Sequence, residues 1–269
     1  MAQIDIKECT IKIWDGTPST KVMNSVPANS DVTFTTISTH HGSKPVTVTF
    51  IDPGAPSQAL SISVTNEDIE VSLATSTASA ITTTAAQVKT AIEADADADA
   101  LVTVTVEGAG SGVVQAIAKS TLIGQNSMTV TIGEGNVTYS EKRPVDFTLD
   151  RGLIDTVRLA DEEPIDVSMD FTWEFLSSGT GDTVPTIEEA LKKTGLASAW
   201  VSSSTDPCQP YSVDLEIYNN PVCGAEESEI ITIEEFYWES LDHDLREGAV
   251  AISGRANRNY ATVARRPSV

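Results

Sequence analysis

Residues 165–175 alternate without interruption between apolar and polar side chains, and this pattern restricts the possible fold more than any other feature. The apolar positions are Ile165, Val167, Met169, Phe171, Trp173 and Phe175. The positions between them are Asp166, Ser168, Asp170, Thr172 and Glu174. Because successive side chains of a β-strand point to opposite faces, the run predicts a strand with one face in a hydrophobic core and one acidic face.

Shorter runs of the same period occupy most of the chain, so we expect a mainly β protein. Outside the middle region, the predicted strands cover residues 4–14, 128–132, 137–140, 145–149, 212–218, 229–238 and 249–254. A helix is predicted at residues 186–193, between Pro185 and Gly195, with Lys192 and Lys193 in its last turn. The periodicity therefore predicts a set of β-strands accompanied by one α-helix.

The middle region, residues 23–122, is rich in Thr, Ser, Ala and Val and contains no Arg. Apolar triplets with period two predict strands at Val46/Val48/Phe50, Leu60/Ile62/Val64, Ile69/Val71/Leu73 and Val102/Val104/Val106. Thr84 and Gln87 form a capping-box pattern, and Ala85, Val88 and Ile92 follow at helical spacing. We therefore expect a small β-rich domain with one helix at residues 23–122, and a discontinuous domain formed by residues 1–22 and 123–269.

The chain of 269 residues carries 17 basic and 39 acidic residues, a net charge of −22. This charge repels phosphate and argues against tight nucleic-acid binding, although it permits loose passage of DNA. Acidity alone is also typical of an ordinary solvated surface. We expect neither an export signal nor a membrane span, because no stretch has the required apolar character. Cys9, Cys208 and Cys223 form no paired motif, which favours assembly in a reducing cytoplasm.

Motifs that carry chemistry are weak in this sequence. Asp95, Asp97 and Asp99 imitate the start of a calcium loop, but Ala100 and Val106 replace the glycine and glutamate that such a loop needs, so a solvated loop is expected. The remaining candidates are His40 and His41 for a metal site, Gly108, Gly110 and Gly112 for a phosphate-binding loop, and His243 for catalysis. None of them has the neighbouring residues that such a site needs. The sequence therefore predicts neither an enzyme nor a cofactor.

Several segments, in order along the chain, resemble the major tail tube proteins of siphophages. They are residues 133–143, 149–152, 161–167, 185–191, 200–202, 208–211 and 252–257. Together with the first strand, the matching regions cover somewhat over half of the chain. The middle region, notably residues 52–60 and 84–88, is similar to a small module that recurs as an insertion in phage tail and other virion proteins.

The resemblance implies a subunit with a β-sandwich or barrel and a flanking α-helix. Such subunits form hexameric rings, which stack into a tube around the tape-measure protein and later the double-stranded DNA. Other tail proteins would meet the tube at its ends. Such a protein is located in the virion, is assembled in the host cytoplasm and makes no contact with a membrane. The inserted domain is expected outside the tube wall and dispensable for assembly.

The acidic face of the long strand supplies the candidate lumen-facing residues, because carboxylates lining a tube would let DNA slide without binding. From this strand the set includes Asp166, Asp170 and Glu174, and Asp146 and Asp150 are added from the polar face of another alternating strand. The alternative is that this face meets solvent outside the ring.

No acidic residue follows Glu247, whereas four arginines do: Arg255, Arg258, Arg265 and Arg266. We expect them to form an inter-subunit arm, since arginine engages carboxylates through paired hydrogen bonds. A frayed, solvated tail is the alternative interpretation of the C-terminal segment.

For the function of the whole chain, the alternative is a secreted or surface β-sandwich module that binds carbohydrate or calcium.

Overall fold

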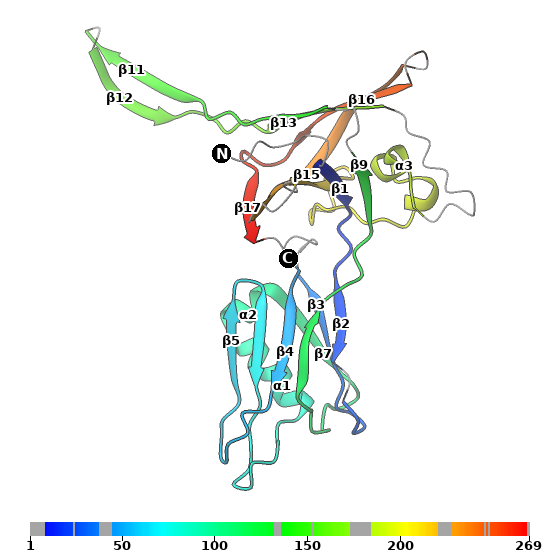
Figure 1. The fold of residues 1–269 in the computed structure, drawn as a ribbon. Coiled ribbons are helices and arrows are strands. Elements are labelled where there is room, and N and C mark those ends of the chain that lie inside the picture. Colours follow the sequence, from blue (N-terminus) through cyan, green and yellow to red (C-terminus); the bar gives the residue numbers. More distant parts are fainter. Residues whose placement is uncertain are drawn as a thin grey trace. The chain divides into compact units, whose positions relative to one another are not determined.

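The computed structural model describes residues 9–23, 25–37, 45–131, 136–151, 153–172, 184–219, 227–244, 246 and 248–267. The chain divides into two compact units, shown in Figure 1. The first unit comprises Met1–Gly16 and Asn126–Val269, and the second comprises Thr17–Gln125. Both are built mainly from β-strands, as the alternating sequence predicts.

The first unit contains an eight-stranded antiparallel sheet in the order β10-β13-β16-β15-β14-β1-β9, with β17 paired to β15. The strands are β1 (Cys9–Trp14), β9 (Ser127–Thr131), β10 (Asn136–Ser140), β13 (Ile165–Thr172), β14 (Val213–Asn219), β15 (Glu227–Asp244), β16 (Ala249–Ala256) and β17 (Thr262–Pro267). The C-terminal segment, expected as an arm or a frayed tail, thus includes a strand of the chain's own sheet.

Strand β15 belongs to both halves of this sheet. Its first part pairs with β14 and β17, and its second part pairs with β16. Between the two parts, Glu235 has a left-handed backbone with φ of 53°, and Phe236 pairs with both Val213 and Ala256. The hydrophobic core draws buried side chains from both halves and from α3 (Ile187–Lys192), which contributes Ala190 and Leu191.

Helix α3 begins and ends as its sequence predicts, with one change. Thr186 caps its first turn, and Glu189 completes a capping box by accepting from the backbone N–H of Thr186. The helix stops at Lys192 because Lys193 adopts a left-handed conformation, so the end comes before Gly195. The 3₁₀ turn η2 (Gly195–Ala197) follows.

The predicted alternation of β13 is confirmed in its described part. Ile165, Val167, Met169 and Phe171 are all buried. Asp166, Ser168 and Asp170 lie on the opposite face of the sheet. Within the sheet, β13 lies between β10 and β16. Trp173, Glu174 and Phe175 lie outside the described residues.

A separate two-stranded hairpin extends the first unit beyond β10 and β13 (Figure 1). It consists of β11 (Val145–Asp150) and β12 (Leu153–Leu159). The sequence predicts β11 but not its partner. We call residues 145–159 the arm, and from here on the word refers to this hairpin and not to the C-terminal segment.

The second unit has two sheets and its own core. One sheet is β2 (Thr20–Met23), β3 (Val32–Thr36) and β7 (Val102–Val106); the other has the order β5-β6-β4-β8, formed by β5 (Ser61–Thr65), β6 (Asp68–Ser72), β4 (Thr47–Ile51) and β8 (Ile117–Thr121). The sequence boundaries of 23 and 122 fall slightly inside this unit, since β2 pairs with β3.

Helix α1 (Ala85–Ala94) has the predicted capping box of Thr84 and Gln87, and it buries Val88 and Ile92. A second helix, α2 (Ala96–Leu101), replaces the loop expected at the aspartate run. The physical reason is a side-chain cap, because the Asp95 carboxylate accepts from the backbone N–H of Ala98 at 3.0 Å.

Candidate functional site

The arm has one apolar face and one polar face. Its directly paired apolar residues form three cross-strand rows: Val145 with Leu159, Phe147 with Val157, and Leu149 with Ile154. Val145 is 38% exposed and the other five side chains are 56–65% exposed. None of these residues belongs to either hydrophobic core. This is an ordered apolar surface without a cover in the described part of the chain.

Local sequence explains how the arm forms. Arg151, with φ of 49°, follows β11 at the start of the turn, and an irregularity between Thr148 and Leu149 shifts the register of the pairing strand. On the polar face, Asp146 lies opposite Arg158 in the register of the two strands. The hydroxyls of Thr148 and Thr156 contact each other.

A hairpin of two strands is only marginally stable in water unless its apolar face is covered. Complete burial of a large aliphatic or aromatic side chain contributes about 1.5–3 kcal/mol, so covering the exposed half of six such residues is worth on the order of 5 kcal/mol. Exposed apolar patches of this kind mark interaction sites in soluble proteins. The arm therefore supplies a strong driving force for association.

The structure separates the four candidate acidic residues that it describes into two groups. Asp146 and Asp150 lie on the polar face of the arm, whereas Asp166 and Asp170 lie on the outward face of β13 in the large sheet. Glu174 lies outside the described residues. Sequence alternation alone places these residues on polar faces, but it does not show that the faces belong to different sheets.

Asp166 is paired with two cations. The Lys142 ammonium donates to its carboxylate at 2.8 Å, and Arg255 Nε donates at 3.2 Å. The hydrogen bond from Lys142 is the main reason that the pKa of Asp166 lies below its usual range. Asp170 is exposed and forms no ion pair with a described side chain. Of the two, Asp170 is therefore the less compensated negative charge.

The outward face around Asp166 is lined mainly by hydroxyls. It forms a shallow groove of about 270 Å³ between β10, β13 and β16. Thr138 and Ser140 come from β10, Ser168 from β13 and Ser253 from β16. Asp166, Glu239 and Arg255 also line the groove, so the surface combines hydroxyls with paired charges.

The candidate arginines are placed in two ways. Arg255 lies within 3.8 Å of Glu239 as well as contacting Asp166, and Arg258 contacts Glu234 at 3.0 Å and Glu235 at 3.1 Å. Both guanidinium groups are thus engaged inside the chain. The backbones of Arg265 and Arg266 lie in β17, opposite Glu229 and Ser228. Contact of these arginines with a neighbouring subunit stays a prediction.

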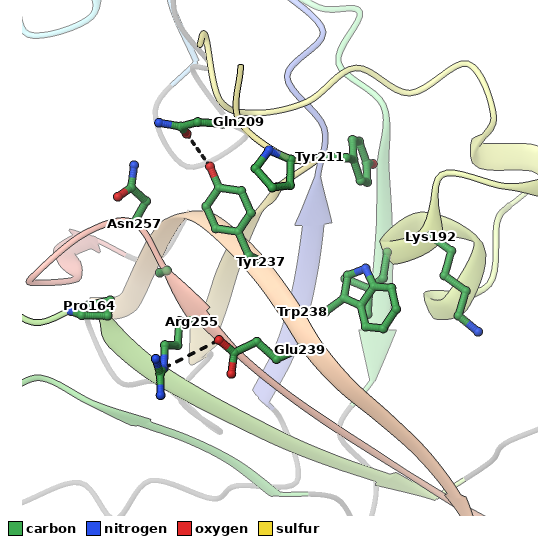
Figure 2. A pocket seen from close by; sticks show the side chains of 12 residues that line it. Pro164, Lys192, Gln209, Tyr211, Tyr237, Trp238, Glu239, Arg255 and Asn257 are labelled. Atoms are coloured by element: carbon green, nitrogen blue, oxygen red, sulfur yellow. Dashed lines mark hydrogen bonds and ion pairs between the residues drawn. The ribbon is translucent and has the colours of Figure 1, made fainter. Parts of the chain in front are cut away.

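A second surface was not anticipated from the sequence. A pocket of about 660 Å³ lies between the end of α3, the loop before β14, and strands β15 and β16 (Figure 2). Tyr211, Tyr237, Trp238, Pro210 and Leu191 provide its aromatic and apolar lining. We call it the aromatic pocket. Its rings come from chain positions that only the folded sheet brings together.

Hydrogen bonds hold the lining of the aromatic pocket in place. The Gln209 side-chain oxygen accepts from the hydroxyls of Ser204 at 2.7 Å and Tyr237 at 2.5 Å. The Tyr211 hydroxyl donates to the backbone carbonyl of Ala190 at 3.0 Å, and burial raises its pKa. Trp238 is less enclosed, with 37% of its surface exposed. The pocket is therefore preformed, with one accessible ring in its wall.

The weaker sequence candidates concern metal sites, histidines and membrane spans. They contain no group of three or more histidine, cysteine or acidic side chains arranged to hold a metal ion. His243 contacts Glu188 of α3 through its Nε2 atom. His40 and His41 lie outside the described residues. No helix in the described ranges is long and apolar enough to cross a membrane.

The arm and the aromatic pocket are thus the two surfaces that most need an explanation. Comparison of the chain with protein-family models, with curated proteins and with solved structures yields no match.

Proposed function

We propose that this chain is a structural subunit that assembles with copies of itself into stacked rings, forming the tail tube of a siphophage virion. The observation that carries the proposal is the uncovered apolar face of the arm. The ordered sequence resemblance to tail tube proteins and the mainly β fold support it. The number of subunits in a ring, six by the resemblance, belongs to the same proposal.

The arm favours assembly of this particular kind. A projecting surface that binds a different surface on the next copy makes a heterologous contact, and such contacts generate rings or filaments rather than closed pairs. Assembly also covers the arm and so stabilises a hairpin that is marginal by itself. A tube is what results when rings of this type stack.

The outward face of β13 suits the inside of such a tube. In the proposal it faces the tape-measure protein during assembly and DNA during ejection. Asp170 repels phosphate, and the two cations on this face, Lys142 and Arg255, are already paired with acidic side chains. The ends of the tube contact other tail proteins, and assembly takes place in the host cytoplasm.

The test uses the purified full-length chain and a matched pair of double variants. Phe147→Ser with Val157→Ser removes the central row of the arm's apolar face, and Thr148→Ala with Thr156→Ala alters the neighbouring row on its polar face. Electron microscopy and sedimentation velocity measure assembly. We expect tubes of uniform diameter from the unmodified chain and the threonine variant, and monomers from the Phe147 variant.

Two outcomes would count against the proposal. One is a monomeric unmodified chain at every salt and protein concentration, which would favour the binding-module alternative. The other is normal tube formation by the Phe147 variant, which would show that the arm does not drive assembly. Circular dichroism of each variant establishes that the remaining sheet is folded.

A further inference from the structure

A heterologous contact requires two different surfaces on each subunit. The arm is the first, and the second must be a concave, largely apolar site on another copy. Of the two pockets described above, the aromatic pocket is the larger and the more apolar, while the groove beside Asp166 is lined by hydroxyls and charges. The aromatic pocket is thus the better match for the arm.

The composition of the aromatic pocket is typical of an interface anchor site. Residues that dominate binding energies are enriched in Trp, Tyr and Arg, and they cluster in preformed pockets near the centre of an interface. Tyr211, Tyr237, Trp238 and Arg255 all line this pocket. Gln209 and Tyr237 are fixed by their mutual hydrogen bond, so the site needs little ordering when a partner binds.

The arm presents one matching anchor. Phe147 is its only aromatic residue, lies in the central of the three apolar rows, and is 59% exposed. Aromatic rings in contact favour offset or edge-to-face arrangements, which a pocket walled by several rings provides. Val145 and Leu149 flank Phe147 on the same face of the strand and would cover the rim of the pocket.

Charge does not oppose a contact between the two surfaces. The arm carries Asp146, Asp150 and Asp155 against Arg151 and Arg158, a net charge of −1. Of the two cations that line the pocket, Lys192 lies 3.6 Å from Glu188, and Arg255 is paired with Asp166 and Glu239. The pocket is therefore close to electrically balanced, and the match between the two surfaces rests on their apolar and aromatic side chains.

From these observations we infer that the aromatic pocket of one subunit receives Phe147 on the arm of another subunit. The inference rests on the proposed function, because it names the surface that the assembly arm binds. Each subunit then inserts its arm into one neighbour and receives the arm of another neighbour in its pocket, so the contact has a direction.

A mixing experiment tests this pairing. The arm variant carries Phe147→Ser and Val157→Ser, and the pocket variant carries Trp238→Ala. Removing either anchor is expected to weaken association by at least about 30-fold, so that each variant alone is monomeric. In an equimolar mixture, the intact arm of the pocket variant binds the intact pocket of the arm variant. The expected product is a 1:1 dimer of the 28.6 kDa chain, measured by sedimentation velocity.

Controls separate this pairing from misfolding and from the broader proposal. Trp238→Phe keeps a ring in the pocket and should assemble, and Tyr260→Ala removes an exposed ring outside the pocket and should also assemble. Tube formation by the Trp238→Ala variant would overturn the pairing while leaving tail-tube assembly intact. A mixture that stays monomeric would overturn it as well. A monomeric unmodified chain would instead refute the proposed function.

Discussion

Asn126 binds Asp15 through both its backbone and its side chain, and Asp15 is completely buried. The Asn126 backbone N–H donates to Asp15 Oδ1 at 3.0 Å, and its side-chain amide donates to Oδ2 at 2.9 Å. The N–H of Asp15 in turn donates to the Asn126 carbonyl at 3.1 Å. These two residues flank the second unit in the sequence, so the bonds hold together the two points at which the chain leaves and rejoins the first unit.

Replacing Asp15 by alanine should destabilise the first unit. The carboxylate also accepts from the N–H of Val201 at 3.1 Å, and its loss leaves several donors without their acceptor. We expect a cost of about 3 kcal/mol and a fall of about 10 °C in the unfolding midpoint of that unit. Differential scanning calorimetry measures it, with Asp161→Ala as the exposed control. An unchanged midpoint would contradict this role for Asp15.

Deleting residues 17–125 in favour of a short Gly-Ser linker should leave the first unit folded and able to form tubes. The Asp15–Asn126 contact continues the antiparallel pairing of β1 with β9, so a tight turn can join the two strands directly. Circular dichroism and electron microscopy test this expectation. Loss of tubes from a chain that remains folded would show that the second unit takes part in assembly.

Strict alternation with one buried face makes β13 predictable, since four of its side chains point into the core without interruption. The signal is incomplete, because β3 also alternates, between buried and half-buried residues, and was not predicted, whereas β11 was predicted although all its residues are exposed. The return strand of the arm was missed because its pairing is irregular. Thr148 pairs with Thr156 but Leu149 pairs with Ile154, and the extra residue, Asp155, breaks the period of two.

The candidate surfaces were only partly predictable for a similar reason. Alternation placed Asp166 and Asp170 correctly on a polar face, but it did not reveal that Lys142 and Arg255 lie beside Asp166. Tyr211 and Trp238 line the same pocket although they come from the loop before β14 and from β15. Such contacts depend on register and chain direction, which local patterns do not specify.

Acid should weaken the contact between Asp166 and Lys142. Because the pKa of Asp166 is lowered in the folded chain, the stability from this pair is fully present above the carboxyl's ordinary pKa of 3.8 and is lost as pH falls through the lower folded value. Both groups are exposed to solvent, so the effect should be small. The difference in unfolding midpoint between the unmodified chain and Asp166→Asn should shrink from pH 7 to about pH 2.

Asp170 is the better position for testing the lumen assignment, because a lysine at residue 166 would stand beside two existing cations. In phage particles carrying Asp170→Lys, tubes should form normally but DNA ejection should slow, since the new cations hold phosphates along the path. Asp170→Asn removes the charge without adding a cation and should eject DNA normally. Ejection at the normal rate from the lysine variant would place this face outside the lumen.

Two variants separate the structural role of strand β17 from the role of its arginines. A chain ending at Asn259 lacks β17 and leaves the Glu227–Thr232 part of β15 without this partner. Losing these backbone hydrogen bonds should cost roughly 3 kcal/mol, lower the unfolding midpoint of the first unit by about 10 °C, and expose an edge that aggregates irregularly. The full-length variant Arg265→Ser with Arg266→Ser keeps the strand and removes only the charges. If these arginines contact an acidic neighbour, that variant should unfold like the unmodified chain but polymerise less, and its polymerisation should lose its dependence on salt. Equal unfolding midpoints for the truncated and full-length chains would show that β17 contributes nothing to the sheet. If the double variant polymerises as much as the unmodified chain at both low and high salt, the arginines are not part of the interface.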